Sequence, residues 1–257
     1  MAARRLAARH VARPWGRTRL SPWYPDALEP VGEVWFEAPP LLVKFLFTSS
    51  VLSVQVHPPD DVARRRHNSA GKTEMWHVVE AEAGAAIAAG FRRAVTAEEL
   101  RAAAADGSIA DLMEWHAASP GDTFFIPAGV VHAIGAGLVL CEIQQFSDVT
   151  YRLYDWGRQP ARELHLEESV AVASLGPAQC RVAARRGELV RCPYFVTERL
   201  EVAGKVEWGG PSLLIALSGT GTVQEAAFHP GEVWQVDAGG MVESHESVTA
   251  LRVTIPD

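Results

Sequence analysis

Two short stretches of alternating polarity, residues 53–58 and 71–76, constrain this chain more than any other feature. In the first (SVQVHP), polar side chains alternate with valines, which is typical of a β-strand with one polar face. The second (GKTEMW) places Lys72, Glu74 and Trp76 on one face in the same way. If both strands face the interior of a small barrel, burying these polar groups without partners is costly. The pattern therefore predicts a bound divalent metal ion that satisfies them.

A third stretch, residues 120–132 (PGDTFFIPAGVVH), has the order turn, strand, Pro-Gly turn and a second strand that His132 enters. Its spacing, G-x5-P-x-G-x2-H, resembles the second motif of the cupin superfamily, in which the Gly and Pro residues shape the turns that point a histidine into the barrel. With Gln55, His57 and Glu74, His132 completes a set of two imidazoles, one carboxylate and one amide oxygen. Such ligands suit one Zn²⁺ ion per chain, with Fe²⁺ or Mn²⁺ as alternatives.

The turn pattern recurs near the C-terminus. Residues 230–239 (PGEVWQVDAG) mirror residues 120–129 (PGDTFFIPAG), and Val242 then stands where the first copy has His132. We therefore expect a mainly β fold in two parts. Residues 1–160 would form a cupin-type (jelly-roll) barrel that carries the metal site. Residues 161–257 would form a connector and a degenerate cupin-like β domain that has lost the metal ligand.

A few helices are expected beside the strands. Thr96 and Glu99 form a capping box, which predicts a helix from residue 96 to about residue 105. A second short helix is expected near residues 109–115, and a third helical or irregular segment in the connector. The Pro-Pro-Asp-Asp run at residues 58–61 and the Arg-rich residues after it are expected to form a solvated loop.

Composition narrows the class of protein. The net charge of −7 argues against nucleic acids and anionic membranes as partners. No apolar run approaches the roughly 20 residues that a transmembrane helix needs. The cysteines are odd in number and have no CxxC spacing, which favours free thiols in a reducing cytoplasm. Because the net charge is negative, an anionic substrate would have to be bound by local positive charge.

Several runs of the chain resemble the type I phosphomannose isomerases (mannose-6-phosphate isomerases) in their short bacterial form. These runs are LLVKFLF, LSVQVHPPDD, GKTEMWHVVEAEAGA, GDTFFIPAGVVHAIGAG and EIQQFSDVTYRLYDWGR, within residues 14–158. The resemblance implies a zinc enzyme with a cupin-type fold that interconverts mannose 6-phosphate and fructose 6-phosphate. When the family's site residues are carried over by position, the resemblance implies that the zinc ligands are Gln55, His57, Glu74 and His132. The family's active-site arginine corresponds to Arg152.

Such a site supports aldose–ketose isomerisation through an enediol. The metal and Arg152 would stabilise the negative charge that develops on the sugar oxygens O1 and O2. A base must move a proton between C1 and C2, and the sequence leaves three candidates: Lys72, Asp148 and Glu142. A dication beside Lys72 would lower its pKa, which suits a base. Lys44 and Ser53 are expected to contact the phosphate or neighbouring substrate oxygens.

The chain departs from the family pattern between Trp35 and Leu41. Family members carry a longer, partly helical segment there, and this chain does not. Because that segment would supply a lid or rim, two alternatives stay open: an isomerase for another aldose or sugar phosphate, and a metal-bound cupin that binds a sugar without turnover.

Overall fold

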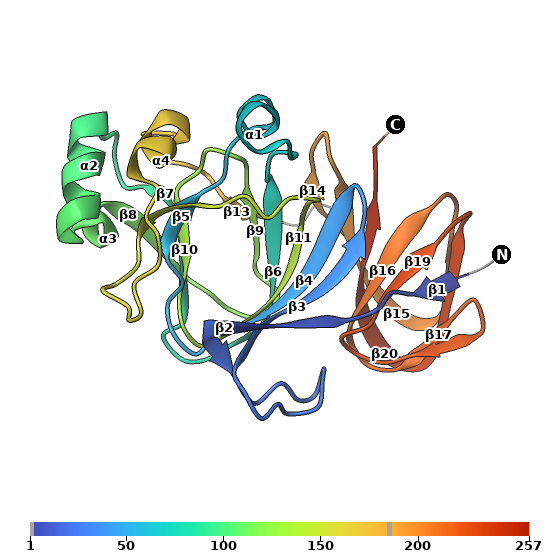
Figure 1. The fold of residues 1–257 in the computed structure, drawn as a ribbon. Coiled ribbons are helices and arrows are strands. Elements are labelled where there is room, and N and C mark those ends of the chain that lie inside the picture. The colour runs from blue at the N-terminus through green and yellow to red at the C-terminus, as the bar shows by residue number, and fades with distance from the viewer. Residues whose placement is uncertain (1–2, 184–186, 257) are drawn as a thin grey trace.

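The computed structural model describes residues 3–183 and 187–256, and antiparallel β-sheets dominate it (Figure 1). The expected mainly β fold class is confirmed. A seven-stranded sheet has the order β13-β9-β6-β11-β4-β3-β2. Its strands are β2 (Arg9–Arg17), β3 (Val31–Ala38), β4 (Leu41–Phe47), β6 (Glu74–Ala81), β9 (Thr123–Ile126), β11 (Leu138–Gln145) and β13 (Arg181–Val182).

A five-stranded sheet of order β12-β5-β10-β7-β8 faces the first. Its strands are β5 (Val54–Val56), β7 (Ala86–Phe91), β8 (Met113–Ala117), β10 (His132–Ile134) and β12 (Tyr151–Tyr154). Apolar side chains of both sheets form one buried cluster; Trp76 and Leu140 come from the larger sheet and Ile87 and Ile134 from the smaller. The two sheets therefore make the walls of the expected barrel.

Four helices lie in the described residues: α1 (Asp60–His67), α2 (Ala97–Asp106), α3 (Ile109–Leu112) and α4 (Leu166–Val172). Helix α2 begins as predicted, with Thr96 Oγ1 accepting a hydrogen bond from Glu99 N at 3.1 Å. Residues of α2 such as Leu100 and Ala103 pack against the outer face of the five-stranded sheet. Helices α2, α3 and α4 thus lie together beside the five-stranded sheet, and α1 lies apart from them at one end of the barrel (Figure 1).

Two local predictions were wrong. The second short helix ends at Leu112, because Met113–Ala117 pairs with β7 and becomes a strand. The expected solvated loop contains helix α1, in which Pro59 is the N-cap. Acidic residues occupy the first turn of α1 and basic residues its last turn, an arrangement that the helix dipole favours.

Strands β3 and β4 form a tight hairpin. Ala38 pairs with Leu41, so only Pro39 and Pro40 lie between the strands. The short connection between Trp35 and Leu41, which departs from the family pattern, is therefore a direct strand-to-strand turn. It contains no segment that could extend over the barrel.

An eight-stranded sheet holds the C-terminal part of the chain. Its strands are β1 (Ala3–Arg5), β14 (Glu188–Arg191), β15 (Val196–Trp208), β16 (Ser212–Ser218), β17 (Gly221–Val223), β18 (Ala226–Phe228), β19 (Val233–Val236) and β20 (Gly240–Thr254). Phe45 and Cys141 of the barrel pack with Ile215 and Leu251 of this sheet in one buried cluster. The sheet therefore stands against the outer face of the seven-stranded wall.

The turns of the internal repeat have matching backbones. Gly121 and Gly231 have φ values of 91° and 86°, and Gly129 and Gly239 have 90° and 102°. A degenerate cupin at the C-terminus and a boundary near residue 160 nevertheless stay predictions. Each half also lends a strand to the other, since β1 pairs with β19 and β13 pairs with β9.

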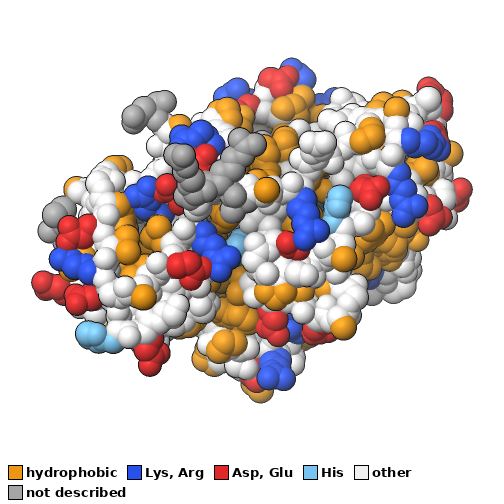
Figure 2. All heavy atoms as spheres, turned by 180° about the vertical axis from the view of Figure 1, so that it is seen from behind, with side chains coloured by type: hydrophobic (Ala, Val, Ile, Leu, Met, Phe, Trp, Pro, Cys, Tyr) orange, Lys and Arg blue, Asp and Glu red, His pale blue; other side chains and the backbone are white. Residues whose placement is uncertain are grey.

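Acidic and basic side chains lie interspersed on the face of the molecule that Figure 2 shows, with hydrophobic side chains between them. None of the helices in the described ranges combines the length and apolarity that a membrane crossing requires.

Candidate metal centre

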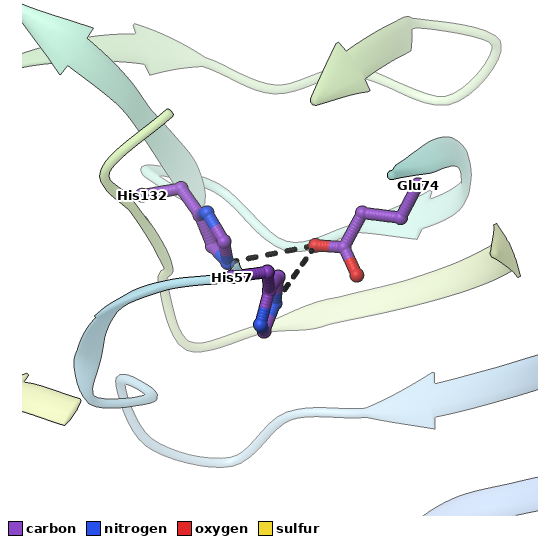
Figure 3. Close-up of side chains that lie close together, drawn as sticks. All are labelled: His57, Glu74 and His132. Carbon is purple, nitrogen blue, oxygen red and sulfur yellow. Dashed lines mark ion pairs between the residues drawn. The ribbon is translucent and has the colours of Figure 1, made fainter. Parts of the chain in front are cut away.

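Three buried side chains from separate segments converge inside the barrel (Figure 3). His57 follows β5, Glu74 begins β6 and His132 begins β10. Glu74 Oε1 lies 3.5 Å from the Nε2 atom of each histidine. Ligand atoms bound about 2.1 Å from a tetrahedral zinc ion lie about 3.4 Å from one another. The spacing of the three groups therefore fits ligation of one ion.

Both histidines are held in the tautomer that a metal requires. The Nδ1 atom of His57 lies 3.0 Å from the carbonyl oxygen of Val149, and that of His132 lies 2.9 Å from the carbonyl oxygen of Val130. Because a carbonyl only accepts, each ring donates through Nδ1 and turns its Nε2 lone pair toward the centre of the cluster, where Lys72 Nζ lies 3.0 Å from His57 Nε2. Burial, reinforced by the Lys72 ammonium, lowers the pKa of His57 to about 4, so this ring is neutral at neutral pH.

Glu74 supplies a buried carboxylate with unused lone pairs. Neither of its oxygens accepts a hydrogen bond from the described residues. The Lys72 Nζ atom approaches Glu74 Oε2 to 2.7 Å, close enough for an ion pair although not in hydrogen-bond geometry. Burial raises the pKa of Glu74, but the Lys72 ammonium outweighs it and holds the pKa well below its usual range. An ionised carboxylate at this depth, paired with Lys72 but accepting no hydrogen bond from the described residues, has lone pairs that a metal cation would satisfy.

Gln55 is the cross-strand partner of His132, and its Nε2 atom lies 3.2 Å from His132 Nε2. The Ser53 hydroxyl donates to Gln55 Oε1 at 3.2 Å. A hydroxyl can also accept, so turning the amide by 180° would keep the Ser53 contact and direct the oxygen toward the cluster. The four residues of the expected ligand set therefore lie together and fit a zinc ion.

A cavity of about 390 Å³ adjoins this cluster, and Gln55 and Lys72 form part of its wall. The structure brings together in its lining all the residues that the sequence assigned to catalysis or substrate binding, namely Lys44, Ser53, Lys72, Glu142, Asp148 and Arg152. Their roles in a reaction stay predictions.

The three candidate bases differ in environment. Glu142 is buried; its Oε1 lies 3.0 Å from Lys44 Nζ, and its Oε2 accepts a hydrogen bond from Trp76 Nε1 at 2.9 Å. Asp148 is exposed at the cavity wall. For Lys72, burial lowers the pKa, but the carboxylates of Glu74 and Glu142 outweigh burial and raise the pKa above its ordinary value. The sequence predicts that a dication lowers the pKa of Lys72. The side chains alone have the opposite effect and raise it.

Arg152 differs from the other cations of the cavity. It is the cross-strand partner of Gln55, and its Nη1 donates to the carbonyl oxygen of Glu163 at 2.8 Å. The other four cations each pair with a carboxylate: Arg13 with Glu33, Lys44 with Glu142, Lys72 with Glu74 and Arg162 with Asp155. Within the described residues, no carboxylate pairs with Arg152, and its Nε is buried without an acceptor. This guanidinium can therefore receive an anionic group.

Sequence reasoning missed one wall of the cavity. Arg13 donates from Nε to Glu33 Oε2 at 2.9 Å, and the same oxygen accepts from Trp35 Nε1 at 3.0 Å. Trp35 and His165, which also line the cavity, were not among the residues assigned to the site from the sequence. The positions of Glu33 and Trp35, two apart on one strand, were the available signal, since they place both side chains on one face.

The chain is similar in sequence to known mannose-6-phosphate isomerases. No model of a protein family matches the chain. The mannose-6-phosphate isomerase of Streptococcus mutans serotype c is 38% identical over 198 residues, which are 72% of this chain and 62% of that protein. Mannose-6-phosphate isomerase ManA of Bacillus subtilis is 37% identical over 193 residues, 69% of this chain and 61% of that protein. The chain thus spans about three fifths of the length of these curated relatives.

Solved structures agree in fold. The mannose 6-phosphate isomerase from Bacillus subtilis has a TM-score of 0.86 at 23% identity, covering 99% of this chain and 100% of that one. A mannose 6-phosphate isomerase in its zinc-bound form has a TM-score of 0.79 at 15% identity, with 100% of both chains covered. The resemblance expected from the sequence runs is confirmed, and so is the cupin-type fold.

Proposed function

We propose that this chain, which is similar in sequence and fold to mannose-6-phosphate isomerases, is a zinc-dependent aldose–ketose isomerase. Its substrates would be mannose 6-phosphate and fructose 6-phosphate, interconverted through an enediol. The observation that carries the proposal is the convergence of His57, Glu74 and His132 beside a cavity in which Arg152 has no carboxylate partner among the described residues.

Four residues would hold the metal: Gln55, His57, Glu74 and His132. The chemistry that a bound zinc ion supplies there is polarisation of the sugar carbonyl. The guanidinium of Arg152 would donate hydrogen bonds to the sugar oxygens as they gain negative charge, and a donor fixed in advance is effective in this role. Lys44 and Ser53 would contact the phosphate or neighbouring oxygens from the same cavity wall.

The proton transfer between C1 and C2 needs a base at the cavity wall. Glu142 has the best support among the three candidates, because it is a carboxylate already oriented by Lys44 and Trp76. For Lys72 the neighbouring carboxylates raise the pKa, which favours the ammonium, and an ammonium cannot accept a proton. Asp148 is exposed to water and has no partner that orients its carboxylate among the described side chains.

A coupled assay that follows fructose 6-phosphate formed from mannose 6-phosphate tests the proposal. Turnover should disappear after treatment with a chelator and return when zinc is added. Turnover that survives complete metal removal would contradict the proposal, and binding of the sugar phosphate without turnover would favour a non-catalytic cupin.

The short β3–β4 hairpin favours a second candidate, an isomerase for another aldose or sugar phosphate, because it leaves one side of the site without the family's longer segment. A panel of sugar phosphates in the same assay separates the two. A cytoplasmic location is part of the proposal, and the three free, buried cysteines support it.

A further inference from the structure

Asp60, the first residue of α1, joins three segments that are far apart in the sequence. Its Oδ1 accepts hydrogen bonds from Gly71 N at 2.8 Å and from Gln145 Nε2 at 3.0 Å. Its Oδ2 accepts a hydrogen bond from the Tyr194 hydroxyl at 2.9 Å, across 134 positions of the chain. Tyr194 lies between β14 and β15, so this contact ties the C-terminal sheet to the barrel.

The same contacts lead directly to the metal centre. Gln145 Oε1 accepts a hydrogen bond from Thr73 N at 2.9 Å, and Gln145 N donates to the Thr73 carbonyl at 3.1 Å. Thr73 lies between Lys72 and Glu74. Its hydroxyl oxygen accepts from Ala128 N at 3.2 Å, in the turn that precedes His132. Gln145 therefore connects the Asp60 carboxylate to the backbone that carries Glu74.

The loop at residue 71 also packs tightly against the start of α1. A Cβ atom added to Gly71 would lie 2.7 Å from Asp60 N and 2.9 Å from the carbonyl carbon of Pro59. The loop therefore has no room to move toward the helix, while the Asp60 carboxylate holds it from moving away. Burial raises the pKa of Asp60, but the hydrogen bonds from Gly71, Tyr194 and Gln145 outweigh it and lower the pKa, so the acceptor is ionised at neutral pH.

We propose that Tyr194 is a positioning residue of the metal centre: by holding Asp60 from the C-terminal sheet, it fixes the strand entry that carries Lys72 and Glu74. Hydrogen bonds to an ionised acceptor are among the stronger ones, so loss of this hydroxyl loosens the Asp60 carboxylate and the loop that it holds. The C-terminal sheet thereby takes part in metal binding although it supplies no ligand. This inference rests on the proposed zinc site.

The test compares Tyr194→Phe with Tyr24→Phe. Tyr24 is a matched control because its hydroxyl also links the N-terminal half to the C-terminal sheet, donating to the Gly231 carbonyl at 2.6 Å, yet it contacts no ligand segment. Two quantities are measured: the rate at which bound zinc passes to an excess of chelator, and amide hydrogen exchange of residues 70–76 in the zinc-free protein. In Tyr194→Phe both should rise about 5- to 10-fold over the unsubstituted protein, and in Tyr24→Phe neither should change.

Unchanged values in Tyr194→Phe, or equal changes in both variants, would overturn the positioning role. An unsubstituted protein that takes up no zinc would contradict the proposed function instead. Hydrogen exchange in the zinc-free protein would still decide the positioning role in that case, so the two failures are distinguishable.

Discussion

Trp35 and Lys44 are cross-strand partners, and the Nζ atom of Lys44 lies 4.6 Å from the centre of the Trp35 ring. The same ammonium is 3.0 Å from Glu142 Oε1. An aromatic face and a carboxylate together hold this buried charge at the cavity wall, which explains how a lysine is accommodated within the apolar run LLVKFLF.

Replacement of Lys44 by Met should destabilise the protein by about 3 kcal/mol, because the Glu142 carboxylate is left buried without its cation. The free energy of unfolding in urea measures this. The double variant Lys44→Met/Glu142→Gln should recover much of the loss, since it removes both charges. Losses that simply add in the double variant would contradict the pairing.

His132→Ala should lower zinc affinity by more than about 100-fold, since it removes a ligand and not merely a group that supports one. Metal content after dialysis against a zinc buffer measures the change. His116→Ala is the control: its ring packs near Phe124, with the ring centres 5.9 Å apart, on a strand that contributes nothing to the metal centre. A His132→Ala protein that retains zinc as His116→Ala does would remove His132 from the ligand set.

The metal ligands could be predicted from the sequence because their positions are fixed by local rules. Strand alternation groups Gln55 with His57, and the turn spacing before His132 aims its ring. The salt bridge between Arg13 and Glu33 could not be predicted in this way, since it depends on how β2 lies against β3 and the register shifts within that pair.

Each of the two wrong local predictions has its own physical reason. Residues 113–117 follow a helical turn, and only the pairing with β7 makes them a strand. The Pro-Pro-Asp-Asp run was interpreted as the end of a strand and the start of a solvated loop, yet at the N-cap Pro59 lies before a helix and needs no helical hydrogen bond.

Arg152→Lys should lower kcat about 100-fold or more while leaving zinc content unchanged, because a lysine cannot reproduce the planar set of donors. Steady-state kinetics and metal analysis on the same preparation check both parts. Arg158→Lys is the matched control, since Arg158 pairs with Asp155 at 3.0 Å and does not line the cavity. An Arg152→Lys enzyme with near-normal kcat would exclude the charge-stabilising role.

Stability should depend on pH through His77, which lies on β6 away from the metal centre and contacts Thr123 Oγ1 through Nδ1 at 3.0 Å. Burial, reinforced by the nearby charge of Arg199, lowers its pKa from 6.5 to about 4. Between these two values the unfolded chain binds a proton that the folded protein does not. The free energy of unfolding therefore falls as the pH is lowered through this window, and His77 has no effect on it above about pH 6.5.

The contribution of His77 to this fall should be about 2 kcal/mol between pH 7 and pH 5. Urea unfolding at the two pH values, on the unsubstituted protein and on His77→Gln, isolates it. The glutamine does not titrate, so its stability should fall by about 2 kcal/mol less over the same interval. An identical fall in both proteins would mean that His77 has the same pKa in the folded and unfolded states, and that the buried face of β6 admits a charge at pH 5.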